Sequence, residues 1–414
     1  MRAQFLREEW LNVALGVCTT LFGLLLDVRA LAAESAQCSV AKHSIERASV
    51  IRGLRQKNKV PCTIETRVQV QSFLEHTIRT KISKDKLYYD GLVAKALGFI
   101  PEDFDYEKGL LNLYLTQLGG YYDPDKKRYV MAGWLPEIMQ PSVAVHELTH
   151  ALQDQHYDLN KFIDDKRFTT DELLARSALV EGDATLVMLD YQREFTGEPP
   201  VATLPDVDSF IVQTVLGMAL TNTIGVPESL KATLVFPYVS GARFAHALLK
   251  NGGYSAVDRA FLRPPRSTRE ILHPDEYLAE KGKAENASSD DSSPATYRDT
   301  LGEFSISALF VGEQSLKSRA AQIAAGWEDD IVRVNGARGA EEVIWETRWQ
   351  TDQDAGEFES AYRQLLVSRA QAIKNNASNG QSTIEIDQWK IEITRSAPRE
   401  TRFLARRTNN ASNL

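Results

Sequence analysis

The segment His146-Glu147-Leu148-Thr149-His150 has the residue types and spacing of a hydrolytic metal site. Residues four apart lie on one face of an α-helix, so His146 and His150 would reach one Zn²⁺ ion at about 2.0–2.1 Å. Glu147 would face the open position of the metal and act as general base toward a water molecule. The alternative without a metal site is a pair of histidines on a helix face beside a solvated glutamate. Because the chain has only seven histidines, a chance match is rare, and we expect a zinc site.

A catalytic zinc ion needs a third protein ligand and keeps one position for water. His156 has the spacing of the third histidine in the metzincin pattern HExxHxxGxxH, but Gln153 stands where that pattern has glycine. If the helix continues through Gln153, His156 lies about 15 Å along its axis from His146. Glu181 on a second predicted helix would instead complete a His₂Glu site, and Gly182 beside it would allow close approach. We therefore expect Glu181 to be the third ligand.

The HELTH segment and the later Glu181-Gly182-Asp183-Ala184 resemble gluzincins, over residues 119–189. This resemblance implies a zincin-like fold and zinc-dependent cleavage of a peptide or protein substrate, with an edge strand that pairs with extended peptide. In many gluzincins an aspartate follows the ligand glutamate by four residues, where this chain has Thr185. Asp183 therefore either orients a zinc-bound histidine or accepts a hydrogen bond within its own helix.

A donor should also stabilise the oxyanion formed during peptide hydrolysis. The sequence offers Tyr238, His246 and His273 as candidates, and more weakly Tyr157 and Tyr191. The alternative for each of them is a purely structural role. The sequence alone does not choose among them.

The predicted elements around the motif are mostly helices, with a β-hairpin over 119–131. The expected helices are 64–79, 85–97, 141–157, 171–194, 207–220, 241–250 and 255–262, with breaks at Pro237 and Gly252-Gly253. We thus expect residues 34–283 to form a mainly α zincin-like α+β catalytic domain with a small β-hairpin or sheet.

A polar, low-complexity stretch predicts a linker or loop over 284–298. Beyond it, a helical stretch to about residue 325, a helix over 352–372 and strand-like runs over 330–334, 342–349, 384–394 and 401–406 predict a small C-terminal α+β domain over 299–414. That domain contains no cluster of catalytic residue types.

The N-terminal sequence predicts a Sec-type signal peptide over residues 1–33, with cleavage near Ala32 or Ala33. This predicts a secreted or periplasmic protein, and a membrane association only if the segment remains as an uncleaved anchor. In an oxidising compartment the two cysteines of the mature chain, Cys38 and Cys62, would form a disulfide, the alternative being two unpaired thiols.

The net charge of −8 arises from interspersed acidic and basic residues, which offers no basic face to nucleic acid. The expected partner is a peptide or protein substrate. One alternative is a cell-envelope zinc-binding or scaffold protein with a structural or vestigial site, which would have four protein ligands and no need of Glu147. Another is a metalloenzyme that acts on a non-peptide amide.

Overall fold

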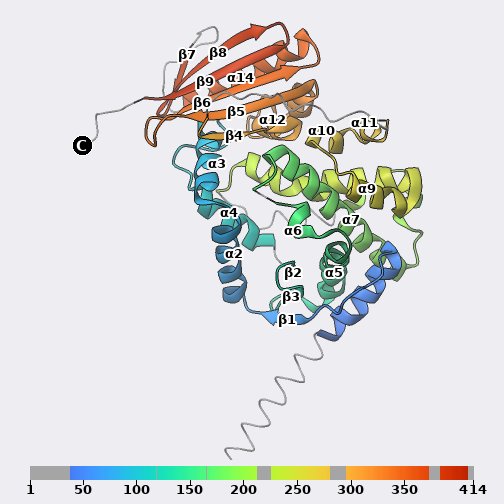
Figure 1. Cartoon of the computed structure of the whole chain (residues 1–414). Coiled ribbons are helices and arrows are strands. Elements are labelled where there is room, and N and C mark those ends of the chain that lie inside the picture. The colour runs from blue at the N-terminus through green and yellow to red at the C-terminus, as the bar shows by residue number, and fades with distance from the viewer. Residues whose placement is uncertain are drawn as a thin grey trace, which may run out of the picture.

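The computed structural model describes residues 38–117, 119–164, 166–211, 225–279, 295–372 and 383–408. The predicted signal peptide and most of the predicted linker lie outside these residues. The protein is mainly α-helical with a small β-sheet near its N-terminus and a larger one at its C-terminus (Figure 1), as the sequence predicts. Among the described helices, none combines the length and the apolar character that a membrane crossing requires.

The described N-terminal part begins within a helix that covers residues 38–52. Its next elements are β1 (Cys62–Glu65), α2 (Arg67–Lys81), α3 (Lys84–Ala96) and α4 (Tyr106–Gln117). The helix predicted to start at Ile64 starts at Arg67 instead, because Ile64 pairs with Met131 of another strand. Thr66 then caps α2 in a capping box with Gln69.

The predicted hairpin is present as β2 (Gly120–Asp123) and β3 (Arg128–Ala132), which pair in antiparallel register. The Asp123 side chain accepts hydrogen bonds from the backbone N–H groups of Asp125 and Lys126, and Lys127 adopts a positive φ of 52°. The strand order is β1-β3-β2, with β1 parallel to β3. Strand β2 therefore lies at an edge of this sheet.

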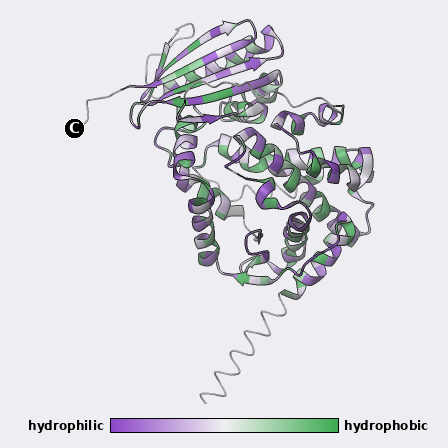
Figure 2. Cartoon of the chain, viewed as in Figure 1, coloured by the Kyte–Doolittle hydropathy of each residue, from purple (hydrophilic) through white to green (hydrophobic). Residues whose placement is uncertain are grey.

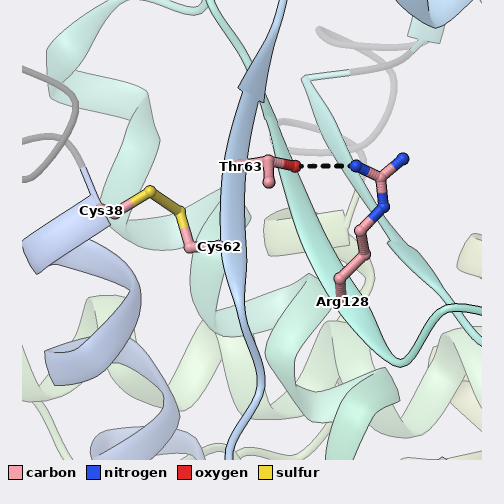
Figure 3. The surroundings of a disulfide bond; sticks show 4 residues. All are labelled: Cys38, Cys62, Thr63 and Arg128. Carbon is pink, nitrogen blue, oxygen red and sulfur yellow. Dashed lines mark hydrogen bonds between the residues drawn. A yellow bond between two sulfur atoms is a disulfide. The ribbon is translucent and has the colours of Figure 1, made fainter. Parts of the chain in front are cut away.

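The predicted disulfide between Cys38 and Cys62 is confirmed, with the two Cα atoms 5.7 Å apart. It joins Cys38, the first described residue of the N-terminal helix, to the first residue of β1 (Figure 3). On the other side of β1, Thr63 accepts a hydrogen bond from Arg128 of β3 at 3.2 Å. The N-terminal helix is thus covalently attached to the small sheet.

Two long helices carry the motif residues of the central part, and a third packs against them. Helices α5 (Gln140–Tyr157) and α7 (Thr170–Thr196) lie close to their predicted bounds. Helix α9 (Glu228–Leu262) differs from the prediction, because it runs through Pro237 and is broken only at Gly252-Gly253. Proline cannot donate a backbone hydrogen bond, and the burial of Phe236 and Phe244 on either side of it offsets this loss. Of the helix predicted over 207–220, residues 208–211 are helical and those from 212 on lie outside the described residues.

The C-terminal part is a six-stranded sheet in the order β4-β5-β6-β9-β8-β7. Its strands are all paired antiparallel: β4 (Tyr297–Asp299), β5 (Trp327–Asn335), β6 (Glu342–Trp349), β7 (Thr383–Ile386), β8 (Trp389–Ala397) and β9 (Glu400–Arg407). Helix α14 (Asp352–Ala372) packs on one face, where the rings of Phe358 and Tyr362 contact Trp345 of β6. Hydrophobic and hydrophilic residues are interspersed along these strands (Figure 2), and the buried ones form the core beneath α14.

Three predictions for this part need correction. The end of the predicted linker forms β4, whose Tyr297 pairs with Val334. The run predicted as one strand over 384–394 is a hairpin, since Asp387 turns the chain with a φ of 52°. The predicted helical stretch is divided into α12 (Gly302–Phe310) and α13 (Ala320–Ala324).

Three short helices complete the central part. In sequence, α6 (Leu159–Phe162) lies between α5 and α7, and α10 (Thr268–Leu272) and α11 (Pro274–Ala279) follow α9.

Candidate metal centre

Helix α5 presents both histidines of the motif on one buried face. Pro141 occupies the first turn, where its missing N–H is tolerated, and Asp158 ends the helix in the left-handed conformation. His146 and His150 are each only 8% exposed, and their Nε2 atoms are 3.2 Å apart. Two imidazole nitrogens therefore converge on one point.

Helix α7 brings a carboxylate to the same point. One oxygen of Glu181 lies 3.1 Å from Nε2 of His146 and 3.4 Å from Nε2 of His150. The three ligand atoms lie within 4.8 Å of one another. Two nitrogens and one oxygen at this separation form a group that can hold a metal ion.

Two glycines allow Glu181 to reach this position. A Cβ added at Gly182 would lie 2.1 Å from the backbone carbonyl of Gly241 in α9, and one added at Gly241 would lie 2.0 Å from the carbonyl oxygen of Ala178 in α7. Helices α7 and α9 therefore cross in backbone contact. Any larger side chain at either glycine would push the helices apart.

The charges of the metal-free site are strongly coupled. Burial alone would raise the pKa of Glu181, but His150 and His146 more than reverse this effect and hold that pKa well below its usual value. Burial would likewise lower the pKa of His150, yet the Glu181 carboxylate raises it to about 9. The site thus favours one positive charge beside Glu181, which a proton or a metal cation can supply.

Glu147 lies beside this group without belonging to it. Its carboxylate accepts a hydrogen bond of 3.0 Å from the backbone N–H of Tyr122 in the edge strand β2. Burial raises the pKa of Glu147, while His150 and His146 oppose the shift. A carboxylate that has a raised pKa and lies next to candidate metal ligands is suited to proton transfer.

His156 is remote from the group, as the continuous helix predicts. Helix α5 passes through Gln153 to Tyr157, and Nε2 of the half-buried His156 contacts the carbonyl oxygen of Arg55 at 2.9 Å. Among the residues that the structure describes, the group that could hold a metal ion therefore contains His146, His150 and Glu181 but not His156.

The outer contacts of the histidines differ from both interpretations of Asp183. Gln153, which stands where the metzincin pattern has glycine and was not predicted to contact the site, contacts Nδ1 of His150 through its side-chain oxygen at 2.8 Å. Asp183 contacts the amide nitrogen of Gln153 and the guanidinium of Arg52, not a histidine. The spacing of three residues between His150 and Gln153 places both on one helix face, and this spacing could have predicted their contact. Nδ1 of His146 is buried without a hydrogen-bond partner in the described part of the chain.

Of the five candidate proton donors, only Tyr238 lies at the site. Its ring centroid is 6.1 Å from that of His146, and burial together with Glu181 and Glu147 raises its pKa well above the usual value. His246 contacts the carbonyl oxygen of Val201, and His273 contacts Glu303. Tyr157 donates to Asp258, and Tyr191 packs against the apolar cluster that includes Val145 and Leu148.

Comparison with known proteins gives one match. A family model described as a domain of unknown function (DUF8575) matches residues 293–410, which include the C-terminal sheet and α14. No curated protein matches the chain, and no solved structure does so.

Proposed function

We propose that this protein is an exported zinc metallopeptidase that hydrolyses peptide bonds. The observation that carries the proposal is the convergence of His146, His150 and Glu181, with Glu147 adjacent but outside the ligand group. A catalytic zinc site uses three protein ligands of these types and leaves a fourth position open. A structural site would need a fourth protein ligand, and His156 lies elsewhere.

The residues of the chain have distinct roles in this proposal. A zinc ion held here would supply a Lewis acid that lowers the pKa of water and polarises the substrate carbonyl. Glu147 accepts the proton of the attacking water and delivers it to the leaving amine. The N–H of Tyr122 orients that carboxylate. Tyr238, whose ring lies 6.1 Å from that of His146, would donate to the developing oxyanion.

The edge strand β2 supports the proposal that the substrate is a peptide and not another amide. Strand β2 is bonded on one side to β3 and has its Tyr122 N–H directed at Glu147. An extended peptide that paired with β2 would therefore lie close to the general base. Export is supported by the disulfide between Cys38 and Cys62, which is typical of oxidising compartments.

The test combines metal analysis with cleavage of a broad peptide library by purified protein. We expect about one zinc ion per chain and hydrolysis that a chelator abolishes. Glu147→Gln should retain zinc and lower kcat by at least about 10²-fold, because an amide cannot accept the proton. Glu137→Gln, which changes an exposed glutamate in the segment before α5, is the matched control. Full activity of Glu147→Gln, or purified protein without bound metal, would overturn the proposal.

A further inference from the structure

The amide group of Gln153 has only one orientation that its surroundings permit. Its nitrogen lies 3.1 Å from the carbonyl oxygen of Val180 and 2.9 Å from a carboxylate oxygen of Asp183. Both of these atoms accept hydrogen bonds, so the NH₂ group of Gln153 must face them. The amide oxygen then faces His150, whose Nδ1 must carry the proton. In the neutral imidazole the lone pair is then on Nε2 of His150, and this is the form that binds a metal ion.

Asp183 is in turn held by Arg52. Both carboxylate oxygens lie 2.6–2.8 Å from Nε of the guanidinium, and both side chains are completely buried. Nη2 of Arg52 also donates to Asp258 of α9 at 2.7 Å. The guanidinium lies 4.7 Å from the ring centre of Tyr254. Arg52 therefore fixes the one carboxylate that fixes the amide of Gln153.

Arg52 is the last residue of the helix over 38–52, and the Cys38–Cys62 disulfide holds the first described residue of the same helix. In Figure 1 this helix, coloured blue, lies on the side of α7 and α9. Its Arg47 also forms an ion pair with Glu194 of α7, at the surface. The N-terminal helix thus reaches the outer contacts of the candidate metal centre through one buried side chain.

We propose that Arg52 is a positioning residue for the metal centre, acting on His150 through Asp183 and Gln153. This inference rests on the proposed metal-dependent function. Without Arg52, Asp183 loses the contact that orients it, and only the carbonyl oxygen of Val180 still holds the amide of Gln153 in the orientation that directs its oxygen at Nδ1 of His150. Metal affinity should therefore depend on a residue about 100 positions away from the ligand in sequence, on a helix that supplies no ligand.

A double-mutant cycle tests the proposal with Zn²⁺ alone, without any peptide substrate. The Kd for Zn²⁺ is measured by competition with a chromophoric chelator for the full mature protein, for Gln153→Leu, for Arg52→Met and for both together. We expect Gln153→Leu to raise Kd by about 10–100-fold and Arg52→Met by about 10-fold. Because both changes interrupt one chain of contacts, the double variant should match Gln153→Leu within about twofold.

The control and the second variant separate positioning from general stability. Arg47→Met removes an ion pair between the same two helices and should leave Kd unchanged within about twofold. If metal-free Arg52→Met does not fold, Arg52→Lys replaces it in the cycle, since lysine keeps the charge but not the planar fork. The visible spectrum of bound Co²⁺ should change with Arg52 variants and not with Arg47→Met.

Two outcomes would overturn the inference in distinguishable ways. If Arg52 and Gln153 act independently, their effects on Kd multiply in the double variant, and the positioning role is wrong while the metal centre stands. An unchanged Kd in a folded Arg52 variant has the same meaning. If the unmodified protein binds no Zn²⁺ at all, the proposed function and this inference fail together.

Discussion

Replacement of Gly182 by alanine tests whether the close crossing of α7 and α9 sets the position of Glu181. The new Cβ would lie 2.1 Å from the backbone carbonyl of Gly241, where ordinary contact begins at 3.4 Å. The two helices would have to separate by about 1.3 Å at this point. A metal constellation tolerates displacements of only about 0.5 Å. Since Glu181 precedes Gly182 directly, its oxygen would leave the position 3.1 Å from Nε2 of His146.

We therefore expect Gly182→Ala to weaken zinc binding by at least about 10-fold and to lower stability by about 1–3 kcal/mol. The first quantity is measured by chelator competition and the second by urea unfolding of the metal-free protein. Gly356→Ala in α14 is the matched control, because its nearest neighbour is a flexible arginine side chain at 3.6 Å. A folded Gly182→Ala protein with unchanged zinc affinity would refute the argument that backbone contact places the third ligand.

Three further predictions follow from the same site and from the disulfide. Glu181→Ala should lose zinc and activity together while His156→Ala retains both, as metal analysis would show; the reverse result would indicate a metzincin-like site. Tyr238→Phe should keep zinc and lower kcat by about 10²–10³-fold if its hydroxyl stabilises the oxyanion, and an unchanged kcat would eliminate it as that donor. Serine at both Cys38 and Cys62 opens a loop with a sequence separation of 24, which should reduce the free energy of unfolding by about 3.5 kcal/mol. A loss in urea unfolding below about 1 kcal/mol would contradict that estimate.

Local pattern was sufficient for the elements in which each residue's neighbours along the chain determine its environment. The bounds of α5 and α7, the β2-β3 hairpin and α14 follow from helical spacing, capping residues and turn residues. The same reasoning failed where packing reversed a local preference. Helix α9 continues through Pro237 because its flanks are buried against other helices, and Ile64 became a strand residue because β3 was available to pair with it.

The candidate metal ligands could be predicted from the sequence because their geometry is mostly helical. The spacing of four between His146 and His150 forces them onto one face, and Gln153 in place of glycine keeps α5 continuous, which removes His156 from the site. The choice of Glu181 also needed only the expectation of a second helix with a small residue beside the ligand. Its partner Gly241 was not identifiable, since no local pattern links residues 59 positions apart.

The sequence by itself thus determined the chemical groups that can hold a metal ion and the helices that present them. The outer contacts were decided only by the tertiary structure. Gln153 contacts His150 within one helix, but its orientation depends on Asp183 of a second helix and on Arg52 of a third. Hydrogen bonds and ion pairs between buried groups have no sequence periodicity, because they depend on which polar atoms the packing of helices brings together.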